Sequence, residues 1–435
     1  MGVMGTLEES GDWSTVTDLE LDVANTALNP YDNHDPAYVR KWMGSVVDPM
    51  YKHLPNLRYL HFSGSASHQV AHYIYIGIAE KYSGQIKRLR TRQSVSFGNQ
   101  IRLEQPASLD LRVEQLYPNF HPIRARPDSL VSLKLYWCLK STFWMMFGDD
   151  PTTVSGVLAF PCLKTLDLKA LLRDVQPGNP RYLPCSTKVG QLHFPALENL
   201  KLKGNPSNAM QILQSSKLPS HMVSIELELH ETMLDEVTSF GLPKADRMAL
   251  ETYVQGDVAD AKTIHAFSAI GELFKSAGAS VEARLQLFNM VPELDFTSMG
   301  FDGLTELYLY SSVNSAEVLD ILTRMQRLRT AHFCVGNLES SNPVLSVGAF
   351  DNRAGPVTPL NSSLRELNTR GMDDGNRGPH LALVKYLLVR LPRLQSYDSI
   401  NVHFDEVAEF INRNAPLYPH LRQIELSLTP QYPVF

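Results

Sequence analysis

A short alternating pattern of apolar and polar residues recurs along most of the chain. It consists of an apolar residue, two variable residues, a second apolar residue, one variable residue and a third apolar residue, as in LKTLDL at 163–168. Clear copies begin at Leu57, Leu130, Leu163, Leu197, Met222, Leu304 and Leu421, and weaker copies begin at Val16, Leu328, Leu364 and Leu394. Because side chains alternate across a strand, each copy predicts a short β-strand with one buried face.

The segments between these copies predict helices and their ends. Apolar residues recur at helical spacing in 36–53, 315–325, 381–391 and 404–412. A proline lies two residues before the start of several copies, at Pro55, Pro161, Pro195, Pro392 and Pro419. Since proline stops a helix and favours an extended residue before it, these prolines mark the passage from a helix to a strand.

A repeating order of strand, loop, helix and loop is typical of leucine-rich repeats. Successive copies from 130 to 222 and from 304 to 421 are 24 to 36 residues apart, near or just above the usual range for this repeat. We therefore predict an α/β fold, a leucine-rich-repeat solenoid or horseshoe with a parallel inner sheet and outer helices. The gaps 57–130 and 222–304 have room for degenerate copies, with 86–89 and 283–288 as candidates.

The pattern predicts one repeat array rather than several unrelated domains. We expect residues 1–15 to form an N-terminal tail and residues 16–435 to form the solenoid. Irregular insertions are predicted near 148–155, 176–190, 230–300 and 340–362. Loops that leave a rigid scaffold in this way often carry binding residues.

The variable positions of each copy predict the surface that such an array would present. Their side chains should point away from the core and into the concave face. There the charge alternates between basic and acidic copies, and tyrosines are present, which are enriched in protein interfaces. The candidate partner-binding residues are Tyr59, His61, Lys134, Tyr136, Lys169, Lys201, Lys203, Glu226, Glu228, Glu306, Tyr308 and Tyr310. This composition favours a protein partner over a uniform polyanion.

The overall charge narrows the classes of partner. The formal net charge is -6 and the pI is near 6.2, so the chain has no global attraction to nucleic acid or to an anionic membrane. Residues 87–126 do carry eight basic residues against three acidic ones, and we interpret them as a solvated loop. No run of about 18 apolar residues predicts a membrane span. We expect neither a nucleic-acid partner nor a membrane.

The cysteines and the missing motifs bear on chemistry and location. The four cysteines form no CxxC pair, which favours a reducing compartment, cytoplasmic or nuclear. The chain has no GxGxxG, Walker A, GxSxG or HExxH motif, so we predict no catalytic residue, cofactor or metal site. Asn361-Ser362-Ser363 fits the glycosylation pattern, which we expect to be unused without a secretory signal. Two alternatives stay open: a regulator of a GTPase or other enzyme, and an enzyme with its site in 230–300.

Three copies with their lead-in residues resemble a known family. LPNLRYLHF at 54–62, FPCLKTLDL at 160–168 and FPALENLKL at 194–202 are similar to the irregular repeats of F-box/leucine-rich-repeat proteins. In that family an F-box recruits a ubiquitin-ligase scaffold, and the repeats hold the substrate. No F-box is recognisable in this chain. The resemblance implies a recognition module that binds a protein, with a role as substrate receptor for a ubiquitin ligase and that scaffold as a second partner.

Overall fold

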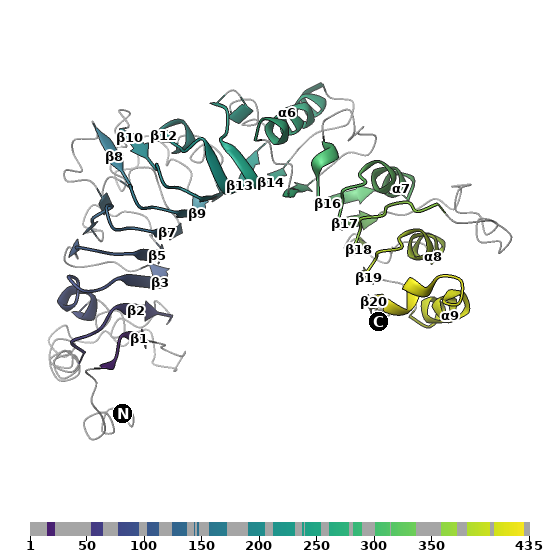
Figure 1. Ribbon diagram of the computed structural model, residues 1–435, viewed down its shortest axis with the longest axis horizontal. Helices are drawn as coiled ribbons and strands as arrows, with labels where there is room; N and C mark the ends of the chain where they lie inside the picture. Colours follow the sequence, from purple (N-terminus) through teal and green to yellow (C-terminus); the bar gives the residue numbers. More distant parts are fainter. Residues whose placement is uncertain are drawn as a thin grey trace, which may run out of the picture. The chain divides into compact units, whose positions relative to one another are not determined.

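The computed structural model describes the strands and helices of the chain with gaps between them. The described residues are 15–21, 54–63, 77–94, 102–112, 124–136, 143, 146–147, 156–171, 190–204, 212–230, 237–238, 240–253, 261–277, 282–288, 301–313, 315–335, 358–371, 381–400 and 404–429. They belong to two compact units, residues 1–220 and 221–435, each of which is treated by itself. Both are mixed α/β and are built on parallel strands (Figure 1).

The described part of unit 1 includes seven parallel strands in the order of the sequence. These are β1 (Asp18–Leu21), β2 (Tyr59–Phe62), β3 (Arg88–Ser94), β5 (Ser108–Arg112), β7 (Ser132–Tyr136), β9 (Thr165–Leu171) and β11 (Asn199–Gly204). Two small parallel sheets accompany them: β4 (Arg102–Leu103) with β6 (Arg124–Ala125), and β8 (Val157–Ala159), β10 (Gln191–His193) and β12 (Ser216–Lys217). In part of unit 1, the connections between the main strands therefore contain the short strands of a second sheet, in addition to helical residues that are described at 77–81, 143, 146–147 and 212–214.

Leucines in register form the core side of the unit 1 sheet. Leu109, Leu133, Leu166 and Leu200 are direct neighbours on successive strands, and all are at most 2% exposed. The alternate residues of the same strands are less buried, as the pleat of a strand requires. The predicted strands and their buried face are thus confirmed for the copies that begin at Leu130, Leu163 and Leu197.

A shared turn leads into several strands. The amide of Leu163 donates to the carbonyl of Phe160 at 3.3 Å, and equivalent bonds join Leu57 to Leu54, Leu197 to Phe194 and Leu394 to Leu391. Each turn has an exposed proline at its second position, where the fixed φ of proline suits a β-turn. The residue before that proline is buried in all four turns. The proline lead-in therefore adds one more side chain to the core of each repeat.

At the start of many strands, two successive amides donate to one backbone carbonyl of the preceding copy. The amides of Lys164 and Thr165 both donate to the carbonyl of Val131, at 2.8 and 3.1 Å. The same paired bonding recurs from β2 to β11 in unit 1 and from β17 to β19 in unit 2. Because these copies dock on their predecessors in the same way, the register passes from one of these strands to the next.

Eight parallel strands are described in unit 2, with helices between most of them. The strands are β13 (His221–His230), β14 (Lys244–Tyr253), β15 (Glu282–Phe288), β16 (Glu306–Val313), β17 (Thr330–Val335), β18 (Glu366–Gly371), β19 (Ser396–Ile400) and β20 (Glu425–Thr429). The helices are α6 (Ala261–Ala277), α7 (Ser315–Arg324), α8 (Leu381–Arg390) and α9 (Phe404–Asn414), with 3₁₀ turns η3 (Phe301–Gly303) and η6 (Pro419–Gln423). Helices α7, α8 and α9 follow one another along one side of β16–β20 (Figure 1).

The structure tests several of the predicted segments. Helices α7, α8 and α9 confirm the helical periodicity of 315–325, 381–391 and 404–412. The predicted helix 36–53 and the insertion 148–155 lie outside the described residues, as do most of the insertions 176–190 and 340–362. Within the described residues of 230–300, β14, α6 and β15 continue the strand order, and β15 includes the candidate copy at 283–288. The gap from 57 to 130 likewise contains β3 and β5.

In two copies, the register with the neighbouring strand is shifted by two residues from the one that the pattern predicts. Leu227, the last apolar residue of its copy, is in the row of Leu250, Leu285 and Leu307. Leu426 similarly pairs with Tyr397, and the start of that copy forms η6 instead of a strand. A shift of two residues keeps each side chain on the same face, because strand side chains alternate with a period of two.

A polar chain of hydrogen bonds is buried in the core of unit 2. The hydroxyl oxygens of Tyr397 and Thr369 lie 2.7 Å apart. The Thr369 hydroxyl donates to the Ser399 hydroxyl at 3.2 Å. The Ser399 hydroxyl in turn donates to the backbone carbonyl of Thr369 at 3.1 Å. Since the proton of Thr369 goes to Ser399, the hydroxyl of Tyr397 is the donor to Thr369. Burial raises the pKa of Tyr397 to about 12, and the hydrogen bonds oppose this only in part.

This pKa predicts an alkaline loss of stability that Tyr397→Phe should remove. The unfolded side chain ionises near pH 10 and the folded one near 12, so its contribution is complete below about pH 10 and is lost as the pH rises through about 12. At neutral pH the variant should be about 1 kcal/mol less stable, because one hydrogen bond is gone. Urea unfolding across this range should show the difference shrinking above about pH 10; a constant difference would contradict the assignment.

Candidate functional site

The candidate site is the polar face of the strands, defined as the side chains that alternate with the buried leucine rows. All twelve predicted residues are on these strands: Tyr59 and His61 on β2, Lys134 and Tyr136 on β7, Lys169 on β9, Lys201 and Lys203 on β11, Glu226 and Glu228 on β13, and Glu306, Tyr308 and Tyr310 on β16. Eleven are half-buried, and Tyr310 is 40% exposed. Their role in binding stays a prediction.

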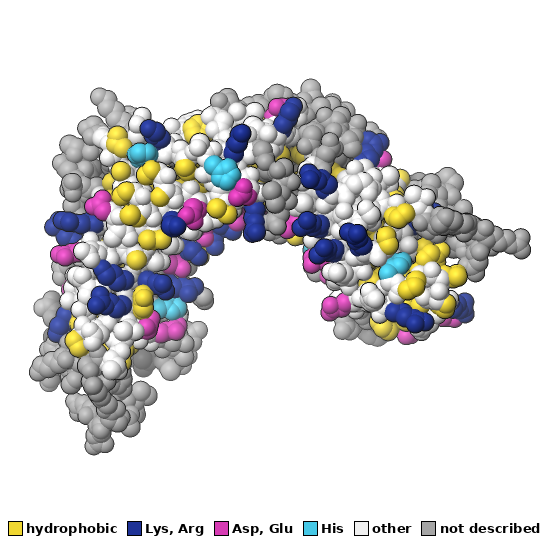
Figure 2. Space-filling view, viewed as in Figure 1, with side chains coloured by type: hydrophobic (Ala, Val, Ile, Leu, Met, Phe, Trp, Pro, Cys, Tyr) yellow, Lys and Arg dark blue, Asp and Glu magenta, His cyan; other side chains and the backbone are white. Residues whose placement is uncertain are grey.

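At the start of unit 1, acidic and basic side chains pair across neighbouring strands. His61 Nδ1 lies 3.0 Å from Glu20 Oε1, and Arg90 Nε lies 3.2 Å from Asp110 Oδ2. The guanidinium of Arg88 is 4.7 Å from the centroid of the Tyr59 ring. Figure 2 shows side chains of both charges side by side over the region of β2, β3 and β5. This part of the polar face is electrostatically balanced.

Arg88 and Arg90 correct the interpretation of residues 87–126 as a solvated loop. Both are on β3 and share the polar face with Tyr59 and His61, which are their register partners on β2. The signal was present in the sequence, because Leu89 has the spacing of a core position. Thr91 hid it by occupying the place of the third apolar residue, where it is only 1% exposed.

Further along unit 1, lysine residues and one buried carboxylate occupy three neighbouring strands. Asp167 on β9 is directly between Lys134 on β7 and Lys201 on β11 in the register. Lys169, on the same strand, places its Nζ 3.4 Å from Asp167 Oδ2 and 5.3 Å from the centroid of the Tyr136 ring. We call Lys134, Lys169, Lys201 and Lys203, with Asp167, the lysine cluster.

Asp167 is the most enclosed charged residue of this cluster. Its side chain is 9% exposed, and its Oδ1 atom is buried without a hydrogen-bond partner among the described residues. Partial burial lowers the pKa of Lys169, but the charge of Asp167 and the contact with Tyr136 outweigh it and leave that pKa above its ordinary value. Lys169 therefore carries its positive charge firmly at neutral pH. The alternating pattern of 163–168 puts Asp167 on this face, but the pattern does not predict the burial of its side chain.

The polar face of unit 2 is acidic and contains an aromatic stack. Its described acidic side chains are Glu226, Glu228, Glu251, Glu306, Glu366, Asp398 and Glu425, and Arg247 is basic. The Tyr308 and His332 rings stack with centroids 4.4 Å apart, and the Tyr308 hydroxyl donates to Glu306 Oε2 at 3.3 Å. These contacts fix Tyr308, while Tyr310 offers an exposed ring beside it.

Two further features, a metal site and a membrane-spanning helix, concern the described residues only. Within them, no group of three or more His, Cys, Asp or Glu side chains is arranged to hold a metal ion. No helix among them combines the length and the apolar character needed to cross a membrane.

Comparisons with known proteins place the chain far from characterised relatives. No family model matches it, and no curated protein matches it. Among solved structures, a TLR13–ssRNA13 complex is similar over 81% of this chain and 43% of the TLR13 chain, with 14% identity and a TM-score of 0.35. The chain thus spans less than half the length of that neighbour. The description of the fold rests instead on the strand register given above.

Proposed function

We propose that the chain is a leucine-rich-repeat solenoid that recognises a protein partner through the polar face of its parallel strands. The observation that carries this proposal is the division of each strand into two faces. In each unit one face has buried apolar side chains in register, most of them leucines, and the other presents charged and tyrosine side chains that are mostly half-buried. A sheet whose second face held no partner would need no such aromatic residues there.

The repeated docking of copies supports the solenoid part of this proposal. A single strand with its connecting segment cannot enclose its own apolar face, so stability comes from stacking on neighbours. The paired amide bonds to one carbonyl recur from copy to copy, which is the behaviour of a repeat. The resemblance of 54–62, 160–168 and 194–202 to F-box/leucine-rich-repeat proteins extends the proposal to a substrate receptor in ubiquitination.

Binding should depend on the tyrosine pair of β16. Tyr308→Ala combined with Tyr310→Ala is expected to weaken partner capture by roughly 30-fold, as loss of an aromatic hot spot does in protein interfaces. The measurement is affinity purification from a native extract followed by mass spectrometry, in which a ubiquitin-ligase scaffold is sought among the captured proteins. Phe404→Ala is the matched control, because Phe404 is an exposed aromatic residue on α9, 53% exposed.

Two outcomes would contradict binding of the partner by the tyrosine pair of β16. Retention of the same partners by the double tyrosine variant would remove the polar face from the binding site. Loss of partners in the Phe404→Ala variant as well would show that a helix surface binds instead.

A further inference from the structure

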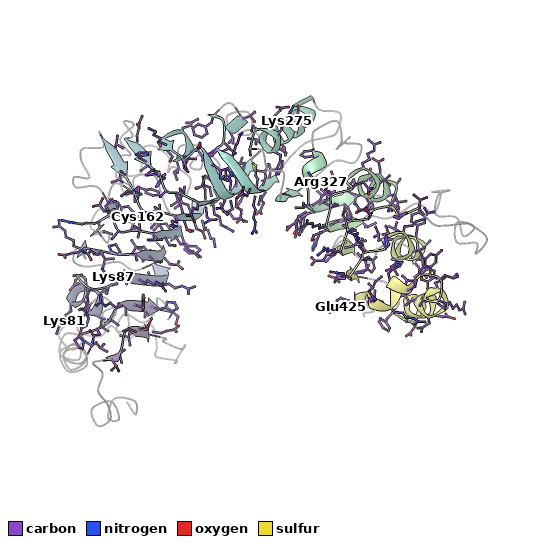
Figure 3. The ribbon with its side chains drawn as sticks, viewed as in Figure 1. Lys81, Lys87, Cys162, Lys275, Arg327 and Glu425 are labelled. Carbon is purple, nitrogen blue, oxygen red and sulfur yellow. The ribbon has the colours of Figure 1, made fainter. Side chains whose placement is uncertain are left out.

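Exposed arginines follow one edge of the sheet in the second half of unit 2. Parallel strands all begin at the same edge, so the residues that lead into β17, β18, β19 and β20 lie along that edge. Figure 2 shows Lys and Arg side chains together over the region of β16–β18, and Arg327 is labelled in Figure 3. The exposed arginines of these four connections, which we call the arginine edge, are Arg327 and Arg329 before β17, Arg365 before β18, Arg393 before β19 and Arg422 before β20.

Hydrogen bonds at the strand entries bring some of these arginines close together. The amide of Arg365 donates to the carbonyl of Arg329 at 2.8 Å, and the amide of Gln395 donates to the carbonyl of Arg365 at 2.7 Å. Arg329 and Arg365 are therefore direct neighbours, on strands that are about 4.8 Å apart. Since like charges at this separation repel each other, an anion that lies between them would be attracted by both.

The described carboxylates do not neutralise the arginine edge. None of its five guanidinium groups forms an ion pair among the described residues, whereas Arg324, in the last turn of α7, pairs with Asp320 at 2.8 Å. Glu366 and Glu425 begin β18 and β20 and are on the polar face, on either side of Ser396 in the register. Even if both are counted against the edge, two glutamates leave three of the five positive charges in excess.

The connection from α9 to β20 adds an apolar side chain to the same edge. Leu417 is 60% exposed and lies between the end of α9 and Arg422. Pro416 and Pro419, on either side of it, are also exposed. A leucine side chain gains nothing from a polyanion in water, but it gains apolar contact when it enters the boundary between the headgroups and acyl chains of a bilayer.

We propose that the arginine edge, together with Leu417, binds the surface of an anionic lipid bilayer. The guanidinium group is always charged and donates several hydrogen bonds, which suits the phosphate groups of lipids. Basic residues near an anionic membrane each add to its attraction, and stable attachment takes a second signal, which Leu417 supplies. The expectation of no membrane partner considered the net charge of -6 alone, but screening limits each charge to about 10 Å, so the local excess decides. This surface is separate from the polar face, and its role goes beyond the proposed function.

The layout of the edge favours a membrane over a nucleic acid or a phosphorylated peptide. The described residues of these four connections offer no open aromatic platform for a base, because Tyr418 is half-buried and its ring packs edge-on against His420, with centroids 6.3 Å apart. The arginines are spread along the entries of four strands, whereas a single phosphate group is held by donors that converge on it. A row of exposed cations with an apolar side chain at one end fits an extended anionic surface.

The test measures co-sedimentation of the full chain with vesicles made of equal parts of phosphatidylcholine and phosphatidylserine. Arg329→Gln combined with Arg365→Gln should weaken binding by about 30-fold, because two attractions to the membrane are lost. Lys81→Gln combined with Lys217→Gln is the charge-matched control. Lys81 is exposed in the helical turn before β3 (Figure 3), and Lys217 is exposed on β12, both in unit 1. The control should bind within about twofold of the unaltered chain, since its residues lie outside the arginine edge.

A third variant examines the apolar side chain. Leu417→Ala should weaken binding to the same vesicles by about threefold to tenfold, because less apolar surface leaves water. Val157→Ala is its control, since Val157 is 63% exposed on β8 in unit 1, and its affinity should not change. Circular dichroism of each variant establishes that the fold is intact.

Several outcomes would overturn this inference. Equal binding by the two double variants, equal binding to vesicles of phosphatidylcholine alone, or no binding to the mixed vesicles at low salt would exclude the arginine edge as a membrane site. An unchanged affinity of Leu417→Ala would contradict the entry of Leu417 into the bilayer. A single-stranded oligonucleotide or a phosphoserine peptide that displaces the chain from the vesicles would overturn the choice of a lipid surface.

Discussion

Phe160→Ala is expected to lower the free energy of unfolding by about 4 kcal/mol, the largest effect of any single change considered. Phe160 is 0% exposed, and its ring centroid lies 5.1 Å from those of Phe147 and Phe194 and 6.1 Å from that of Phe143. The contact with Phe194 is stacked at 26°, and the other two are edge-on at 79° and 88°. Removing this ring deletes three aromatic contacts and leaves a cavity in the core.

The same ring also joins two repeats. Phe160 and Phe194 each precede the proline of a lead-in turn, so their stacking links the start of one copy to the start of the next. Phe160→Leu should cost about half as much, because leucine fills much of the volume. Val157→Ala on β8 is the control and should stay within about 0.5 kcal/mol, since Val157 is 63% exposed. A Phe160→Ala loss below about 1 kcal/mol in urea unfolding would show that these rings are not packed together.

The clear copies of the apolar pattern predicted their strands, and polar residues in core positions explain why β3 was only a candidate and why β14 was missed. β3 has Thr91 in the third apolar place, and β14 has Thr252 in a core row where both neighbouring strands have leucine. Both threonines are at most 1% exposed, so they occupy core positions although their residue type suggests a surface. Burial of a short polar side chain depends on partners in neighbouring strands, which a single sequence does not reveal.

The small sheet of unit 1 was beyond the reach of sequence patterns for a different reason. β8, β10 and β12 have only two or three residues each, which is too short for alternation to be recognised. Their pairing depends on the length of the connecting segments between the long strands. Helices α7, α8 and α9 were predictable because ten or more residues carry the apolar spacing.

For the candidate site, the alternation of apolar and polar residues predicted the face on which each side chain lies, but it did not predict the neighbouring side chains. The positions of Lys134, Lys169 and Lys201 on one face follow from the pattern alone. That Lys134 and Lys201 are on either side of Asp167 depends on register between strands more than 30 residues apart in sequence. The chemistry of the lysine cluster is consequently a tertiary property.

Asn361 shows how one buried polar residue can organise a connection in unit 2. Its side-chain nitrogen donates to the carbonyls of Leu322 and Met325, at 3.1 and 2.8 Å, at the end of α7. Its oxygen accepts from the amides of Ser363 and Leu364, at 2.8 and 2.9 Å, just before β18. The side chain is therefore fully hydrogen-bonded and 0% exposed. The nitrogen that glycosylation of this sequon would require is not accessible in the folded chain.

Asn361→Ala is expected to destabilise the chain by about 3 kcal/mol, because two carbonyls and two amides lose their partner. Asn361→Asp should be at least as damaging at neutral pH, since a carboxylate would face the carbonyls of Leu322 and Met325. Its penalty should shrink on acidification, because a protonated carboxyl group can donate again. Urea unfolding at neutral and acidic pH measures both effects, and the exposed Ser362→Ala serves as the control, expected within about 0.5 kcal/mol. If Asn361→Asp were insensitive to pH, or Asn361→Ala as mild as the control, the side chain would not bridge the end of α7 to β18.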